Sequence, residues 1–111
     1  MNVRELRGDQ LDFWVCRAEL GEFAGRRLDD VVIAAVKAKI GSSLPYRPSR
    51  TWLIGGPIIE RQRISVVDRG DHWFADIRGA SAVGGSYLEA AMRAYVASKF
   101  GDEVPGDEVP L

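Results

Sequence analysis

Two side chains of this sequence, Cys16 and His72, are of the types that serve as a nucleophile and a base. The chain has one cysteine and one histidine, and a thiol attacks a substrate only where a neighbouring base or charge activates it. Cys16 follows Trp14 and Val15 in a segment of helical apolar spacing, where free cysteines often pack as small hydrophobic groups. His72 falls in a turn-like segment directly after Asp71. We therefore expect no catalytic residues and a non-enzymatic protein.

Metal-ligating side chains are scarce. A zinc site needs three or four converging Cys, His or carboxylate ligands, and one cysteine with one histidine does not supply them. The carboxylates of Asp68, Asp71 and Asp76 are hard oxygen ligands of the kind that bind Mg²⁺. Aspartates in turns also accept hydrogen bonds from nearby backbone amides, and we favour this interpretation for Asp68 and Asp71. The sequence predicts neither a metal nor another cofactor.

Two glycine pairs, at 55–56 and 84–85, would let backbone amides approach a phosphate, because glycine has no Cβ. Neither pair is followed by the Gly-Lys-Ser/Thr ending of a P-loop. The second pair directly precedes an expected helix start, where Ser86 and Glu89 would engage the free amides. A small phosphate-containing ligand is therefore kept as a second alternative function.

Arginines alternate with aromatic residues in and after a proline-bearing loop. Such a set can contact phosphates and stack on bases, or it can form a solvated face while the aromatic rings close the core. The formal net charge of −1 provides no global field for a polyanion. Exposed aromatic patches are typical of contact surfaces, so we predict a protein-interaction module, with nucleic-acid binding as the alternative. The candidate binding residues are Tyr46, Arg47, Arg50, Trp52, Arg61 and Arg63, and the partner would be a protein of unknown identity.

The length and composition indicate one folded domain. At 111 residues with 46% apolar residues, the chain fits a single core. The sequence GDEVP occurs at 101–105 and again at 106–110, so we expect a globular domain over 1–104 and a frayed acidic tail over 105–111. The polar N-terminus lacks the apolar core of a secretion signal, and no run approaches the roughly 20 apolar residues of a membrane span. We expect a soluble cytoplasmic protein without a membrane partner.

The clearest predicted element is a helix from Ser86 to Gly101. Ser86 and Glu89 have the spacing of a capping box, and Gly101 can turn left-handed beyond the last turn. Apolar residues recur between these signals at the spacing of one buried stripe: Leu88, Ala91, Met92, Tyr95 and Val96. A first helix is expected over 9–20, from the spacing of Leu11, Trp14, Val15 and Ala18.

The middle of the chain predicts a small sheet. Runs at 64–67 and 73–77 are rich in β-branched and aromatic residues and are separated by a strong turn signal, which indicates an antiparallel hairpin. Residues 79–85 resemble a flexible connector. The prolines within 41–57 favour an ordered loop or edge, with Pro57 able to open a short helical turn through Gln62.

The segment 28–40 carries signals for both a helix and a strand, and we favour the helix. The expected class is α+β, with N-terminal and C-terminal helices packed on a small antiparallel sheet that is a hairpin or has three strands.

Several strings of the sequence resemble one family across most of the chain: LDFWVCRAE at 11–19, PYRPSRTW at 45–52, GGPIIER at 55–61, HWFADI at 72–77 and AAMRAYVASKFGDEV at 90–104. Together they are similar to the NinX-like family of small bacteriophage and prophage proteins. Members of this family often have an acidic residue before the tryptophan of the proline-rich loop, where this chain has Thr51. The resemblance implies a phage or prophage gene expressed in a bacterial host, and it supplies no catalytic residues to carry over.

Overall fold

The computed structural model describes residues 1–19 and 47–104. The segment 28–40, the tail 105–111 and the candidate residue Tyr46 lie outside these described residues, so the predictions made for them stay predictions. The described elements, in chain order, are a short 3₁₀ helix η1 (Val3–Glu5), helix α1 (Gly8–Glu19), helix α3 (Trp52–Gln62), strands β1 (Ser65–Asp68), β2 (Trp73–Ile77) and β3 (Ala80–Gly84), and helix α4 (Tyr87–Phe100).

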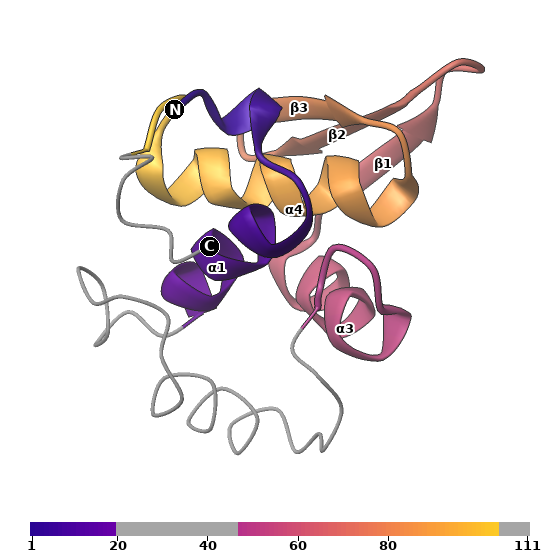
Figure 1. Ribbon diagram of the computed structural model, residues 1–111. Helices are drawn as coiled ribbons and strands as arrows, with labels where there is room; N and C mark the ends of the chain where they lie inside the picture. Colours follow the sequence, from indigo (N-terminus) through magenta and orange to yellow (C-terminus); the bar gives the residue numbers. More distant parts are fainter. Residues whose placement is uncertain (20–46, 105–111) are drawn as a thin grey trace.

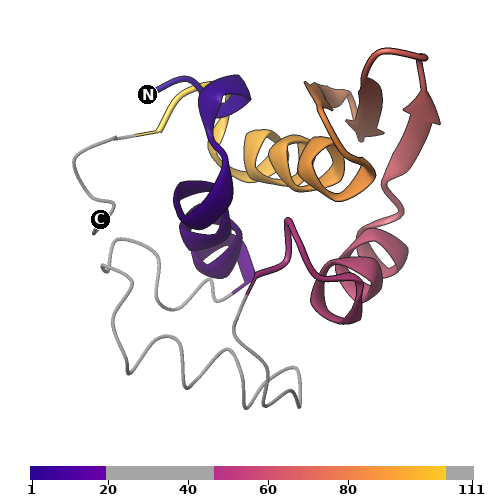
Figure 2. The same ribbon diagram turned by 45° about the vertical axis from the view of Figure 1, so that its right-hand side comes forward.

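Helix α4 is the centre of the structure. It lies between the sheet on one side and helices α1 and α3 on the other (Figures 1 and 2). Its residues from Ala90 to Val96 are all buried, and the largest core side chains packed around it include Phe13 and Trp14 of α1. The predicted α+β class is therefore confirmed, with α1 and α3 forming a layer behind α4.

Local signals place α1 and α4 where the sequence predicts them. The first helix, expected over 9–20, spans Gly8–Glu19. At the start of α4, the hydroxyl of Ser86 accepts a hydrogen bond from the backbone N–H of Glu89. The Glu89 carboxylate accepts from the N–H of Gly85, one residue earlier than in a standard capping box. Gly101 ends the helix with a positive φ of 85°, as expected for a residue without a Cβ.

The sheet has three antiparallel strands in the order β1-β2-β3. The predicted hairpin is confirmed, with Ser65 opposite Asp76 and Asp68 opposite Trp73. Ala75 and Ile77 of β2 are buried on the side of α4. On the opposite face, Val67, Phe74 and Val83 form one cross-strand row, and Val67 and Val83 are 46% and 42% exposed.

The prediction of a flexible connector over 79–85 is wrong, because residues 80–84 form strand β3. Small side chains resemble a linker in the sequence, but their backbone pairs with β2 over its whole length. They also permit close packing, since a Cβ on Gly84 would lie 2.6 Å from the backbone nitrogen of Ala90. The small residues therefore let the strand approach the start of α4.

The prediction of a loop over 41–57 is also wrong from Trp52 onward. Helix α3 begins at Trp52 and continues through Pro57. Pro57 lies inside this helix instead of opening it. An internal proline removes one helical hydrogen bond, but tertiary packing offsets this loss. Gly55 lies so close to the turn before the helix that a Cβ would be 2.3 Å from the carbonyl oxygen of Pro48 and 2.7 Å from Leu88.

The two ends of the described chain pair with each other. The backbone N–H of Val104 donates to the carbonyl of Met1, and the N–H of Val3 donates to the carbonyl of Asp102, each at 2.9 Å. Val104 itself is buried. The first copy of the GDEVP repeat is therefore held against the N-terminus as far as this residue.

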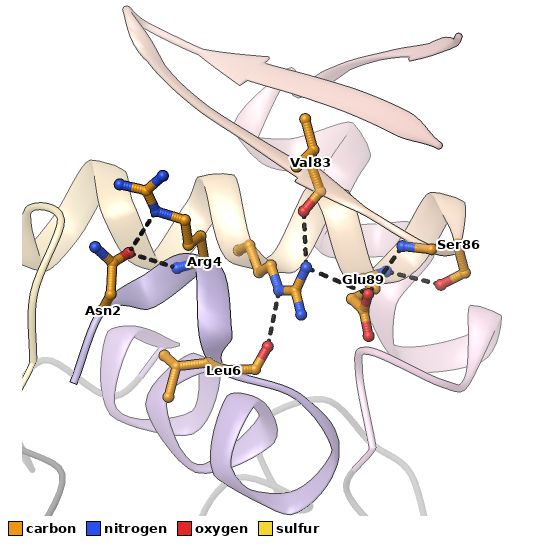
Figure 3. A network of polar contacts seen from close by, with 8 residues as sticks. Asn2, Arg4, Leu6, Val83, Ser86 and Glu89 are labelled. Carbon is orange, nitrogen blue, oxygen red and sulfur yellow. Dashed lines mark hydrogen bonds and ion pairs between the residues drawn. The ribbon is translucent and has the colours of Figure 1, made fainter. Parts of the chain in front are cut away.

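Arg93 of α4 ties distant parts of the chain together. Its Nε donates to the carbonyl of Leu6 and its Nη1 to the carbonyl of Val83, both at 2.8 Å (Figure 3). Glu89, one turn earlier on the same helix, forms an ion pair with it at 3.3 Å. Burial lowers the pKa of Arg93 from its ordinary value, and the Glu89 carboxylate opposes this effect. Arg93 thus joins the N-terminal segment to β3 across α4.

Within the described part of the chain, no helix combines the length and the apolar character needed to span a bilayer.

Candidate functional site

The turn at 47–50, which leads into α3, is held by a buried carboxylate on α1. Asp12 is 2% exposed, and its Oδ1 accepts a hydrogen bond from the backbone N–H of Ser49 at 2.9 Å. Its Oδ2 accepts one from Nη2 of Arg50 at 2.8 Å, and the same nitrogen donates to Asp9 at 2.8 Å. Hydrogen bonds to Asp12 and then to Asp9 raise the pKa of Arg50. The turn therefore has a fixed position relative to α1.

The first turn of α3 is open. Its N-cap residue, Thr51, has extended backbone angles but makes no side-chain capping bond, and the first turn contains no acidic residue. The amides of Ile54 and Gly55 bond to the Thr51 carbonyl. For the amides of Trp52 and Leu53, the described residues provide no hydrogen-bond acceptor. Both side chains are largely exposed, at 58% and 62%.

An aromatic cluster connects this turn to the rest of the fold. The ring of Trp52 lies 5.0 Å from that of Tyr87 at the start of α4, and Tyr87 lies 5.4 Å from Trp73 of β2. Beside the cluster is an open groove of about 330 Å³, where the starts of α3 and α4 meet. We call it the α3–α4 groove; it is lined by Ser49, Arg50, Trp52, Ser86, Tyr87 and Leu88.

The structure separates the candidate binding residues into two groups. Arg50 and Trp52 share the α3–α4 groove, and Arg47 is exposed in the turn before it. Arg61 lies in the last turn of α3, where it forms an ion pair with Glu19 of α1. Arg63 follows the helix as its C-cap, with a left-handed φ of 56°. An α-helix of this length separates its ends by about 15 Å, so these arginines do not form one patch.

Sequence reasoning missed three residues of this region: Ser49, Leu53 and Tyr87. Leu53 and Trp52 are adjacent apolar residues that both stay exposed. Their exposure could not be predicted from the sequence, because apolar residues are usually expected in the core. Tyr87 follows the predicted N-cap Ser86 and could have been placed at a helix start. The role of Ser49 depends on its distance from Asp12, 37 positions earlier, and no local pattern carries that information.

The residues considered for catalysis do not assemble. Cys16 is 0% exposed within α1, and burial, followed by the charge of Glu19, raises the pKa of its thiol to about 12. His72 lies in the exposed turn between β1 and β2, where Nδ1 contacts Asp71 at 2.6 Å. That turn is on the far side of α4 from α1 (Figures 1 and 2).

The metal and phosphate hypotheses find no assembled site in the described residues. Asp68 accepts a hydrogen bond from the N–H of Gly70 at 2.8 Å, which confirms its turn role. No three side chains of the His, Cys, Asp or Glu type gather within residues 1–19 and 47–104. At the second glycine pair, the amide of Gly85 is engaged by Glu89.

A buried polar contact also joins the three helices. Tyr95 of α4 is 1% exposed, and its hydroxyl donates to Glu19 at 3.4 Å, while Glu19 also pairs with Arg61 of α3. Burial, and next the charge of Glu19, raise the pKa of Tyr95 to about 12. This contact fixes the far end of α3, so the first turn of the helix is held on a rigid scaffold.

The structure is that of a small α+β protein with an open groove between the starts of two helices. The family described as "Bacteriophage P22, NinX" matches residues 2–99, and the chain belongs to this family. Among curated proteins, no match to the chain was found. The GGPIIER string that carries much of the resemblance has a structural basis, since Gly55 permits the close approach of α3 and Ile58 is buried in the core.

Proposed function

We propose that this phage accessory protein acts by binding a protein partner through the first turn of α3. The observation that carries the proposal is the exposure of two adjacent large apolar side chains, Trp52 and Leu53, at 58% and 62%. Contiguous exposed apolar patches are typical of interaction sites, and tryptophan is enriched among the residues that dominate binding energy. We call Trp52, Leu53 and the neighbouring Tyr87 the α3 shelf.

The scaffold under the α3 shelf supports this proposal. Asp12 anchors the preceding turn, Gly55 packs against that turn, and the Tyr87 ring packs against the Trp52 ring. A surface that is ordered before binding loses less conformational entropy when a partner arrives. Complete burial of one such side chain would contribute about 1.5–3 kcal/mol.

Binding without catalysis is part of the same proposal. The thiol of Cys16 is buried and its pKa is raised, which disfavours the reactive thiolate at neutral pH. His72 lies on an exposed turn beside Asp71. These two observations support a binding role, and a turnover assay on purified protein would test it.

The nucleic-acid alternative has less support from the geometry. Arg50 and Arg61, two of its proposed phosphate contacts, are engaged by carboxylates of α1. A phosphate backbone would have to compete with Asp9, Asp12 and Glu19 for these guanidinium groups. Binding to single- or double-stranded DNA at low salt would favour this alternative over a protein partner.

The proposal is tested by affinity capture from infected host cells, using wild-type bait and two arginine variants. Leu53→Arg places a charge on the α3 shelf, and Val83→Arg places the same charge on the exposed face of the sheet. We expect both variants to fold, since Leu53 is 62% exposed and Val83 is 42% exposed. A partner should be lost with Leu53→Arg and retained with Val83→Arg, as measured by quantitative mass spectrometry.

Two outcomes would contradict the proposal. Loss of the partner with Val83→Arg alone would assign the interface to the Val67–Phe74–Val83 row of the sheet. Capture of no protein by any bait, together with retention on DNA, would transfer the function to nucleic-acid binding.

A further inference from the structure

The α3–α4 groove contains polar hydrogen-bonding capacity that the fold itself does not use. The hydroxyl of Ser49 is buried without a hydrogen-bond partner, and Ser49 as a whole is only 5% exposed while lining the groove. Buried polar groups are hydrogen-bonded in the large majority of cases, because leaving one unpaired costs free energy. The Ser49 hydroxyl therefore has unused hydrogen-bonding capacity in a residue that lines the groove.

The start of α3 supplies a second, independent feature at the same place. Thr51 provides no side-chain cap, and the amides of Trp52 and Leu53 lack an acceptor within the described residues. The N-terminus of a helix carries a partial positive charge, and its free N–H groups favour an anion. Arg50, whose side chain is 43% exposed, lines the groove beside them.

The charges around the groove limit which anion fits. Arg50 already shares its guanidinium with Asp9 and Asp12, and Glu89 lies at the other helix start, engaged with Gly85 and Arg93. Because Asp9 and Asp12 already share the Arg50 guanidinium, little positive charge is left to balance a dianionic phosphate, whereas a carboxylate brings one negative charge. The groove therefore favours a monoanion.

The remaining lining is apolar. Trp52, Tyr87 and Leu88 form walls next to the polar groups. The volume of about 330 Å³ is near the lower end of ligand pockets, which span about 300–1,000 Å³. This is room for one side chain with an adjoining carboxylate, and not for a large cofactor.

We propose that the α3–α4 groove binds a carboxylate of the partner polypeptide, an Asp, a Glu or the chain end, with an apolar side chain beside it. The carboxylate accepts hydrogen bonds from the amides of Trp52 and Leu53 and from the hydroxyl of Ser49. The apolar side chain packs on Trp52 and Leu88. This inference rests on the proposed function and specifies the chemistry of the partner.

Two probes with the same apolar group test the carboxylate. N-acetyl-leucine carries the carboxylate, and N-acetyl-leucinamide replaces it with a neutral amide. Each is titrated into ¹⁵N-labelled full-length protein, and the amide resonances of Ser49, Trp52 and Leu53 are followed by NMR. We expect saturable shifts with N-acetyl-leucine and binding about fivefold weaker with the amide, the loss expected for a charge-assisted hydrogen bond.

Two substitutions separate ligand binding from folding. Ser49→Ala removes a hydroxyl that has no partner in the free protein, so urea unfolding should occur at the same or a higher concentration, while N-acetyl-leucine binds about fivefold more weakly. Thr51→Asp caps α3 with its own carboxylate, so it should stabilise the fold and abolish binding. Ser98→Ala, on the exposed side of α4, is the control and should leave binding unchanged.

Several results would overturn the inference. Equal binding of both probes, or no saturable shift with either, would show that the groove does not recognise a carboxylate. Easier unfolding of Ser49→Ala with unchanged binding would make the hydroxyl structural, and tighter binding of adenosine monophosphate would assign the groove to a phosphate ligand. In the capture experiment, a partner lost with Leu53→Arg but retained with both Ser49→Ala and Thr51→Asp would leave the proposed function standing and reject only this inference.

Discussion

The starts of α3 and α4 lie on either side of one groove but differ in how they are completed. At the start of α4, Ser86 and Glu89 engage backbone amides with their own side chains, and Leu88 and the residues from Ala90 to Val96 are buried. At the start of α3, Thr51 makes no such bond, and Trp52 and Leu53 are exposed. One helix start is closed by its own sequence, and the other is left open.

The two helices therefore obtain their stability from different sources. Helix α4 has good local signals and a buried face, so it is specified by its own residues. Helix α3 has glycines and a proline in its interior and no cap, so it depends on the packing of Gly55 and on the anchor at Asp12. A helix start that needs neither cap nor burial of its first residues is free to contact a partner.

The largest expected effect comes from filling the space at Gly55. Gly55→Ala places a Cβ only 2.3 Å from the Pro48 carbonyl oxygen. Overpacking of this kind costs about 1–3 kcal/mol or more. We expect a loss of about 3 kcal/mol in the free energy of unfolding, measured by urea denaturation.

Gly56→Ala is the matched control for this substitution. Its Cβ would meet Trp52 at 3.4 Å, and alanine is favoured over glycine in helices by about 0.5–1 kcal/mol. If both variants behave alike, α3 does not depend on close packing at Gly55.

The second effect tests the anchor under the open helix start. Asp12→Ala leaves the N–H of Ser49 without its acceptor and removes the buried partner of Arg50, so we expect a loss of about 2 kcal/mol. Asp9→Ala removes an exposed ion pair and should cost less than about 1 kcal/mol. Equal losses, measured by thermal and urea unfolding, would show that burial of the carboxylate does not matter.

The third effect is a pH dependence of stability that comes from two buried side chains, Cys16 and Tyr95, which contrast with the open groove. Burial raises the pKa of Cys16 from 9.0 to about 12 and that of Tyr95 from 10.0 to about 12. As the pH rises, the unfolded chain therefore loses these protons before the folded chain does. The contribution of the two groups to the free energy of unfolding is fully present below pH 9 and is lost as the pH rises toward 12. Each group contributes a slope of at most about 1.4 kcal/mol per pH unit.

Cys16→Ala should flatten the dependence of the unfolding free energy between pH 9 and 10, whatever its effect on stability at neutral pH. The measurement is urea unfolding at a series of pH values. An unchanged slope would mean that the thiol is not buried in solution.

The smallest effect compares the two N-caps directly. Ser86→Ala removes a capping hydrogen bond and should cost about 1 kcal/mol. Thr51→Ala removes no capping bond, so its effect on the unfolding free energy should be close to zero. A loss at Thr51 as large as that at Ser86 would show that the start of α3 is capped in solution and would remove the contrast between the two helices.

Much of the fold could be predicted because its signals are local. Ser86 with Glu89 and Gly101 defined α4, and the turn at 68–72 with its flanking strand residues defined the hairpin. In each case the deciding interactions join residues a few positions apart, and these distances are visible in a linear sequence.

The candidate site was predicted only in part. Arg50 and Trp52 do share one groove, but Arg61 and Arg63 belong to the other end of α3. Tyr46 lies outside the described residues. The sequence offered an arginine and aromatic composition, whereas the positions of these side chains depend on where α3 begins.

The residues of α1, α4 and the β1–β2 hairpin specify these elements locally, because caps, turns and apolar spacing act over a few residues. Long-range packing is what makes the small residues of 80–84 a strand, starts α3 at Trp52 and carries it through Pro57, and places Ser49 beside an open helix start. These features depend on contacts with Pro48, Asp12 and the β2 backbone, whose distances in space are set only when the whole chain folds.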